Sequence, residues 1–453
     1  MIEWIKTVVL FMMIITSMVL TWFLWTYQPE YETLDDPSGS YIEIEDIGES
    51  RSLFELIFPR EILAHQEDDV DLLLAGNGLY EGILEEIMDT EFHYVTERAG
   101  NLAPHPDHRF TGLEVVFQEP LPADIVYDVL DFEDDSLPFS GLDRMRIVEN
   151  PSRIGSDVVA QFVDMNEETV YETDTDMGLG LLEELIAEGS EEQRLRAERF
   201  VFTESENDEF QNVRYLPSDS FLMERVTYET IDLPVQSFRQ VLFADPEFVK
   251  NYYQDSERRS YTDGNRMLDI VDGEMLLEFR QPESFERTDQ VTPSVIDGAR
   301  QYVNGHSGWT DQYYWNGTNA GNDHEDVSFR LHVNQLPVLS GNVPSEDHFM
   351  YRLRRSGSQF TEYTRPLFQL ADEPFETEAA VELQGSMQLF NQIEEYETFQ
   401  LSEVTDIRLG YQMNRHRSFA IFEPVWYAEV RGRWMELENL TPEPSGGMTI
   451  GLE

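Results

Sequence analysis

Few residues in this chain have the types and spacing that covalent chemistry requires. The nucleophile turn G-x-S-x-G, the zinc motif H-E-x-x-H and the phosphate-binding motifs G-x-x-x-x-G-K-[ST] and G-x-G-x-x-G are all absent from the sequence. The sequence GHSG at residues 305–308 places a serine directly after a histidine. Adjacent residues do not form a triad, because the base must reach the nucleophile from another part of the fold. We therefore expect no catalytic residues.

Candidate metal ligands are equally sparse. His93 and the HPDH sequence at residues 105–108 hold the closest histidines, and this loop could bind a metal, although a solvated loop explains it better. DTDMG at residues 174–178 resembles the opening of a calcium loop. Leu179 and Leu185 occupy the positions where such a loop needs a glycine and a bidentate glutamate. We expect neither a metal nor a cofactor.

Charge limits the partners of the chain. The 453 residues contain 89 acidic and 31 basic side chains, which gives a formal net charge of −58. Nucleic acid and anionic lipid surfaces are poor partners for such a field. Lys6 and Lys250 are the only lysines, and arginine keeps its charge at pH values where lysine begins to lose it. The composition therefore indicates an exterior bathed in alkaline or salty medium, and the absence of cysteine agrees with an exported chain.

One segment is suited to a membrane rather than to water. Residues 7–27 are uncharged and mostly apolar, and as a helix they would rise about 31 Å, which matches a hydrocarbon core of about 30 Å. Lys6 precedes this span and no basic residue follows until Arg51, so the positive-inside rule places residues 1–6 in the cytoplasm. A secretory signal peptide is the alternative, but it would have a shorter apolar region and a small-residue cleavage site.

The remaining chain has globular patterning. Residues 28–40 are polar and read as a stalk, and we expect an α+β fold of three extracellular mixed α/β domains at residues 41–205, 206–350 and 351–453. Prolines at similar positions in the last two domains suggest two related strand-helix-strand-strand units.

Hydrophobic periodicity predicts the main elements. The Asp-Gly pairs at residues 263–264 and 272–273 predict hairpins that join three strands between residues 258 and 281. The other predicted elements are strands at residues 41–47, 61–65, 112–117, 157–163, 222–228, 404–413 and 419–431, and helices at residues 79–97, 123–130, 179–200 and 377–392, with a further helix opened by residues 233–234.

Several segments resemble a known family. They are MVLTW at residues 18–22, WTYQP at 25–29, PREI at 59–62 with His65, LFADP at 242–246, YTDG at 261–264, LGY at 409–411 and PVWY at 424–427. In this order they are similar to the YycH family of membrane-anchored accessory proteins. The resemblance runs over essentially the full length, although this chain is far more acidic than the family leads us to expect.

The resemblance implies a regulator rather than an enzyme. Such a protein pairs with a YycI-like protein and modulates the WalK (YycG) sensor histidine kinase, which controls cell-wall metabolism through a two-component system. The alternatives are an anchored extracellular enzyme acting on the cell wall and a solute-binding module.

Four residues are candidate partner contacts. Ser17 and Thr21 lie on one face of the predicted span, where small and polar residues allow helices to pack closely. Their alternative explanation is ordinary tolerance of such residues in membrane helices. Trp426 and Tyr427 concentrate aromatic area that could dock a partner, although the same pattern is expected of a central strand packed on both faces.

Overall fold

The computed structural model divides the chain into two units, Met1–Glu45 and Asp46–Glu453. In the first unit it describes residues 4, 6, 12, 13 and 16–18, so most of the predicted span at residues 7–27 and the whole stalk at 28–40 lie outside the described residues. Among the described residues, no helix is long and apolar enough to cross a membrane. The second unit is described over residues 47–437, apart from gaps at 68, 76–77, 99–109, 135, 151–154, 191–192, 204–209, 211, 254–257, 272, 274, 284–293, 341–347 and 397–398.

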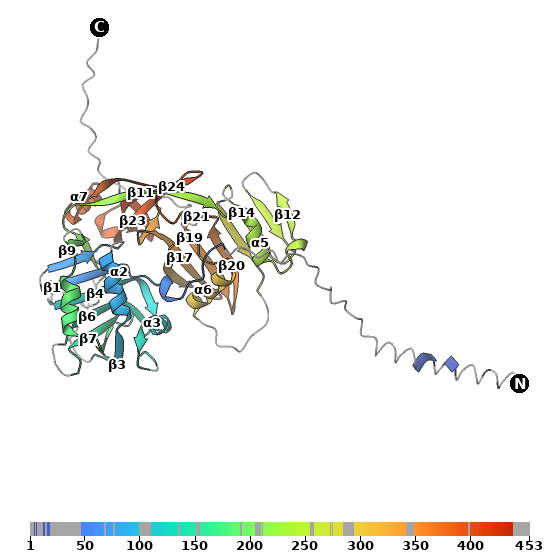
Figure 1. Ribbon diagram of the computed structural model, residues 1–453, viewed down its shortest axis with the longest axis horizontal. Coiled ribbons are helices and arrows are strands. Elements are labelled where there is room, and N and C mark those ends of the chain that lie inside the picture. Colours follow the sequence, from blue (N-terminus) through green and yellow to red (C-terminus); the bar gives the residue numbers. More distant parts are fainter. Residues whose placement is uncertain are drawn as a thin grey trace, which may run out of the picture. The chain divides into compact units, whose positions relative to one another are not determined.

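The first half of the second unit forms a mainly antiparallel sheet with the order β10-β9-β2-β1-β4-β6-β7-β8-β3-β5 over the described residues (Figure 1). Its strands are β1 (Glu61–Glu67), β2 (Asp69–Leu73), β3 (Glu91–Glu97), β4 (Phe110–Pro122), β5 (Asp131–Phe132), β6 (Gly141–Glu149), β7 (Val158–Asp164), β8 (Thr169–Thr175), β9 (Arg194–Thr203) and β10 (Asn212–Pro217). The helices of this half are α2 (Gly78–Met88), α3 (Ala123–Val129) and α4 (Leu179–Ala187), with a short 3-10 turn η1 (Phe54–Leu56).

The second half forms another large sheet, with the order β12-β13-β14-β15-β20-β19-β17-β18-β23-β24-β11-β21, to which β16, β22 and β25 are added through β17, β11 and β24. Its strands are β11 (Phe221–Asp232), β12 (Lys250–Tyr253), β13 (Arg259–Thr262), β14 (Met267–Val271), β15 (Leu276–Arg280), β16 (Tyr313–Ala320), β17 (Glu325–Val333), β18 (Leu336–Leu339), β19 (Met350–Ser356), β20 (Gln359–Pro366), β21 (Phe368–Leu370), β22 (Glu376–Leu383), β23 (Val404–Arg415), β24 (Phe419–Val430) and β25 (Arg433–Leu437). The helices are α5 (Val235–Leu242), α6 (Val295–Gly305) and α7 (Ser386–Glu395), with 3-10 turns η3 (Pro246–Phe248) and η5 (Leu401–Glu403).

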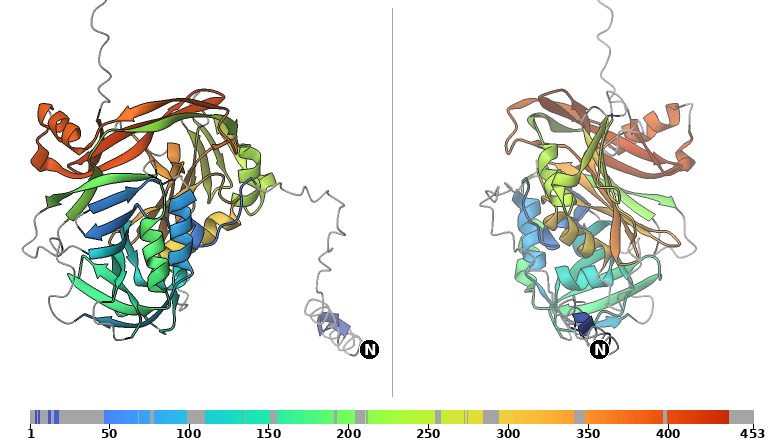
Figure 2. Two further views of the ribbon diagram at one scale, coloured as in Figure 1. Left: turned by 60° about the vertical axis from the view of Figure 1, so that its left-hand side comes forward. Right: turned by 90° about the vertical axis from the view of Figure 1, so that its right-hand side faces the viewer.

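One apolar core runs through both halves. Helices α2 and α4 lie side by side on the first sheet (Figure 2), and α2 buries Leu79, Ile83 and Ile87 along one face. These residues belong to the same buried cluster as Tyr351 of β19 and Tyr411 of β23. The two sheets are therefore held together by continuous packing, and a mixed α/β fold with large sheets is confirmed.

The strand predictions are largely confirmed. The strands predicted at residues 112–117, 157–163, 404–413 and 419–431 correspond to β4, β7, β23 and β24. Both Asp-Gly turns join antiparallel neighbours, β13 with β14 and β14 with β15, and their glycines have φ values of 101° and 66°. A positive φ is the conformation for which glycine is favoured at these turns.

Three helix predictions are wrong over part of their length. The helix predicted at residues 79–97 ends at Met88, because EFHYVTE at residues 91–97 is rich in aromatic and β-branched residues and forms β3. The helix predicted at residues 179–200 ends at Ala187 and β9 follows. In the prediction for residues 377–392, the first part is β22, which pairs with β11, and the helix begins only at Ser386. In each case pairing with a neighbouring strand overrides a local helical pattern.

The three-domain division stays a prediction. Strands from residues 206–350 and 351–453 alternate within the second sheet, for example where β15 pairs with β20. The internal repeat expected from the prolines also stays a prediction. Pro337 lies in β18 and Pro424 in β24, and both strands pair with β23, one parallel and one antiparallel.

Candidate functional site

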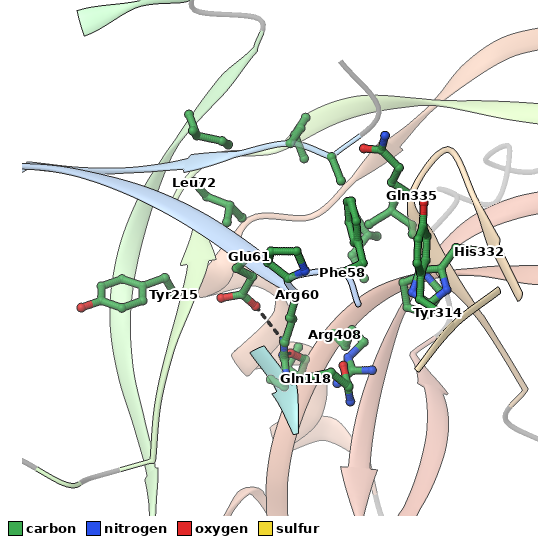
Figure 3. A pocket seen from close by; sticks show the side chains of 18 of the residues that line it. Phe58, Arg60, Glu61, Leu72, Gln118, Tyr215, Tyr314, His332, Gln335 and Arg408 are labelled. Carbon is green, nitrogen blue, oxygen red and sulfur yellow. Dashed lines mark hydrogen bonds and ion pairs between the residues drawn. The ribbon is translucent and has the colours of Figure 1, made fainter. Parts of the chain in front are cut away.

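A pocket of about 70 Å³ lies where the two sheets meet, and we call it the junction pocket. Figure 3 shows its side chains converging from strands of both halves. The first sheet contributes residues at the start of β1, at the end of β2 and in β10, and the second sheet contributes residues of β16, β17, β18, β23 and β24. Its lining includes Phe58, Arg60, Gln118, Tyr314, Leu336, Arg408 and Trp426. Segments far apart in the sequence therefore build one site.

The wall of this pocket contains a buried ion pair between the two sheets. Arg60, at the start of β1, donates to Asp406 of β23 through both terminal nitrogens, with N–O distances of 2.5 and 2.9 Å. Arg60 also donates to the carbonyl oxygen of Ile407 at 2.9 Å, and its Nε donates to Glu61 at 2.9 Å. A bidentate arginine–carboxylate pair is strongly directional, so these bonds fix the position of β1 against β23.

Two further arginines surround the same carboxylate. The Nε of Arg214, in β10, donates to Asp406 at 2.8 Å, whereas the nearest nitrogen of Arg408 is 3.8 Å away. Burial by itself would raise the pKa of Asp406, but the charges of Arg60 and Arg214 outweigh it and hold the pKa well below its ordinary value. Asp406 is therefore ionised at neutral pH and serves as the counter-charge of several arginines.

A second buried ion cluster lies on β1, five residues beyond Arg60. His65 contacts the carboxylate of Glu114 at 3.0 Å, and Arg146 and Arg144 donate to the same group at 3.0 and 3.4 Å. Glu114 is fully buried, which by itself would raise its pKa, but the neighbouring Arg146 and His65 hold that pKa well below its ordinary value. Strand β1 thus carries charged anchors at both of its ends.

A larger and more polar cavity of about 410 Å³ adjoins the junction pocket, and His332 and Gln335 line both. Gln335, in the tight turn between β17 and β18, donates to Glu81 of α2 and so adds another contact between the halves. His332 is neutral, since burial lowers its pKa to about 3. In the polar cavity, burial raises the pKa of Asp311 to about 6.

The residues considered for chemistry serve structural roles where the structure describes them. The carboxylates of Asp174 and Asp176 accept backbone N–H bonds from Ser156 and Glu91. The ring of His306 stacks on Tyr302 and bonds to its carbonyl oxygen. Residues 105–108 lie outside the described residues, and among the described residues no group of His, Cys, Asp and Glu could hold a metal ion.

The structure places two of the four candidate partner contacts in the interior. Trp426 is 3% exposed and its Nε1 donates to the carbonyl oxygen of Gln384 at 3.1 Å, while Tyr427 is fully buried and its hydroxyl donates to Leu339 at 3.2 Å. At these positions β24 lies between β23 and β25, and Trp426 and Tyr427 belong to two different buried clusters, so both faces of the strand are packed. This burial favours the alternative of a central strand, and docking through these side chains stays a prediction.

The other two candidates lie in the N-terminal unit. Ser17 is in a helical segment of the few described residues there, and Thr21 lies outside the described residues. Their role as partner contacts also stays a prediction.

The sequence analysis missed the charged residues of the junction pocket. Asp406 and Arg408 stand two positions apart in β23, on one face of a strand that is otherwise mostly apolar, and Arg60 lies in the PREI segment that carries the family resemblance. The sequence could have indicated this site through two opposite charges at that spacing within an otherwise apolar strand. The pattern does not say that a third charge, more than 300 positions away, completes the cluster.

Comparisons with known proteins agree over the whole chain. The YycH protein N-terminal domain matches residues 3–189, and the YycH protein C-terminal domain matches residues 211–444. A Bacillus subtilis (strain 168) protein named "Two-component system WalR/WalK regulatory protein YycH" is 22% identical over 450 residues, which cover 95% of each chain. The crystal structure of YycH from Bacillus subtilis covers 86% of this chain and 98% of that chain, with a TM-score of 0.69 at 19% identity, so the fold is shared.

Replacing Asp406, the carboxylate that Arg60 and Arg214 share, should show how much the buried ion pairs contribute to stability. We expect Asp406→Asn to lower the free energy of unfolding of the full-length protein by about 3–5 kcal/mol near neutral pH, because buried guanidinium groups lose their counter-charge. Since the folded-state pKa of Asp406 is lowered, its stabilising effect is complete above the unfolded-state pKa of about 3.9 and is lost as the pH falls. Urea denaturation at several pH values should show the difference shrinking below about pH 4.

The matched control for this variant is Glu403→Gln, which neutralises a half-buried carboxylate that pairs with the exposed Arg431. We expect it to change stability far less than Asp406→Asn does, because exposed ion pairs contribute little. A loss in Asp406→Asn that is no larger than in this control, or that does not depend on pH, would contradict the assignment.

The burial of Trp426 leads to a second prediction. We expect Trp426→Ala to destabilise the full-length protein by about 3–5 kcal/mol in urea denaturation, as truncation of buried aromatic residues does. Phe375→Ala, at a side chain that is 61% exposed, is the control and should have a small effect. Unchanged stability of Trp426→Ala together with loss of partner binding would instead support the docking role.

Proposed function

The chain belongs to the YycH family, and from this premise we propose that it is an accessory regulator of a WalR/WalK two-component system. The observation that carries the proposal is the end-to-end match, 95% of each chain, to a relative named as a regulatory protein of that system. That name describes a regulator and not an enzyme, in agreement with the expectation from the sequence.

The proposal extends to location and partners. The protein is anchored by residues 7–27 in the cell membrane, with its N-terminus in the cytoplasm and residues 28–453 outside. It pairs with a YycI-like protein and contacts the WalK sensor kinase, and it modulates the control of cell-wall metabolism. The charge of −58 argues that these contacts are with proteins and not with nucleic acid.

The proposed mechanism depends on the anchor as well as on the exterior. Information passes between helices in the membrane or between domains outside it. In lipid, helices associate through close packing and interhelical hydrogen bonds, which favour small and polar residues such as Ser17 and Thr21. The anchor is therefore an active part of the regulator in this proposal.

Exchange of the anchor tests this proposal directly. Residues 7–27 are replaced by an unrelated single span of equal length in the full-length protein, expressed in its own membrane. We expect kinase output, measured by a reporter of the response regulator, to become independent of the protein, while a YycI-like partner still co-purifies through the exterior. Unchanged kinase output would contradict the helix-to-helix mechanism, and failure to recover either partner would contradict the proposed function.

Crosslinking tests the proposed contact face. The chain contains no cysteine, so single cysteines can be placed at Ser17 and Thr21 and, as controls, at Met18 and Leu20 on other faces of the same helix. We expect crosslinks to a partner helix from the first two positions and few from the controls. Equal crosslinking from all four positions would contradict the assignment of a face.

A further inference from the structure

The junction pocket carries more positive than negative charge, in a protein whose net charge is −58. Arg60, Arg214 and Arg408 surround Asp406, and Glu61 pairs with Arg60. Arg60 and Arg214 bond to Asp406 directly, through three N–H···O bonds in all. Arg408, in contrast, has no carboxylate within hydrogen-bond distance among the described residues.

Arg408 is nine-tenths buried and has an unused donor. Its side chain is 6% exposed, its nearest contact with Asp406 is 3.8 Å, and its Nε has no hydrogen-bond partner among the described residues. The guanidinium carbon of Arg408 lies 4.9 Å from the centroid of the Trp434 ring, and the side chain of Arg408 lines the junction pocket (Figure 3). A buried donor without a partner costs about 1–3 kcal/mol, and more when the group is charged.

The electrostatic surroundings agree with this geometry. Burial, followed by the neighbouring charge of Arg60, lowers the pKa of Arg408 to about 9. A guanidinium group does not lose its proton in proteins. The lowered pKa therefore reflects the cost of keeping the charged group of Arg408 buried beside other arginines. Glu119 lies close enough for Arg408 to influence its pKa, but burial raises that pKa, and Glu119 does not line the pocket. A bound anion would offset the excess of positive charge around Arg408.

Other lining residues give the pocket further polar groups and an apolar wall. The side-chain amide of Gln118 and the hydroxyl of Tyr314 have no hydrogen-bond partner among the described residues, so both can bond to a ligand. Phe58, which stacks on Tyr314 at 4.6 Å, and the side chains of Leu336 and Trp426 supply an apolar wall. Polar groups that converge within a largely apolar lining are typical of small-molecule sites.

We propose that the junction pocket binds a small organic carboxylate with a short unbranched apolar chain, with the carboxylate at Arg408 and Gln118 and the chain against Phe58, Leu336 and Trp426. The cavity of about 70 Å³ corresponds to roughly five water-sized spheres. It therefore encloses the carboxylate and the first few carbons of the ligand. Because the ligand contacts strands of both sheets, its binding stabilises their junction. This inference goes beyond the proposed regulatory function and does not depend on it.

Calorimetric titration of the full-length protein in detergent with straight-chain carboxylates from acetate to octanoate tests the proposal. We expect affinity to rise about fourfold per added methylene, the value for burying one CH₂, until the cavity is filled, and then to level off. Hexanol and hexylamine, which keep the chain but lack the anion, should bind at least tenfold more weakly than hexanoate. Absence of hexanoate binding, or equal binding of inorganic phosphate, would overturn the proposal.

Variants of lining residues test whether hexanoate binds in the junction pocket. Arg408→Met should reduce hexanoate affinity at least tenfold, whereas Arg433→Met, an exposed arginine on the neighbouring strand β25, should leave it unchanged. Ala75→Leu keeps Arg408 and fills part of the cavity, so it should shorten the chain length at which affinity levels off. Unchanged affinity in both Arg408→Met and Ala75→Leu would overturn the assignment. Kinase output is not measured in this experiment, so its result is separate from the test of the regulatory role.

Discussion

The bidentate contact between Arg60 and Asp406 is the constraint on which the arrangement of the two sheets depends. It joins the first strand of one sheet to a central strand of the other, 346 positions away in the sequence, with both side chains buried. A buried ion pair is not by itself a strong source of stability, because desolvation offsets much of the attraction. Its value here is directional, since two parallel N–H···O bonds allow only one placement of β1 against β23.

Around this contact, the acidic chain places several of its few positive charges in the interior. Arg60, Arg144, Arg214, Arg330 and Arg408 all lie within or beside the junction of the sheets and are largely buried. Arginine suits these positions because its planar group can bond to a carboxylate and to a backbone carbonyl at once, as Arg60 does with Asp406 and the carbonyl oxygen of Ile407. The chain as a whole keeps a formal net charge of −58.

The same crowding of arginines explains why a pocket is found at the junction. Asp406 satisfies two guanidinium groups and leaves a third without a hydrogen-bonded counter-charge, next to a space walled by aromatic and aliphatic side chains. A ligand in that space would contact both halves of the fold, so its binding energy would add to the contacts between the sheets. Under the proposed regulatory function, such a site offers a way for a small molecule to influence the surface that both sheets present.

The sequence alone determined the class of the protein, the strands of its sheets and its family, because these depend on local features. Alternation marked β4, β23 and β24, the two Asp-Gly pairs marked their hairpins, and short motifs carried the resemblance that the comparisons confirm. Residues 91–97, 194–200 and 377–383 were misread as helix because their strand state depends on pairing with neighbours that a local window does not include. Only the tertiary structure decided that Trp426 and Tyr427 are interior residues and that Arg60, Asp406 and Arg408 form a site. A charge pair of that kind is defined by proximity in space, and no pattern along the chain encodes which distant strand will supply the partner.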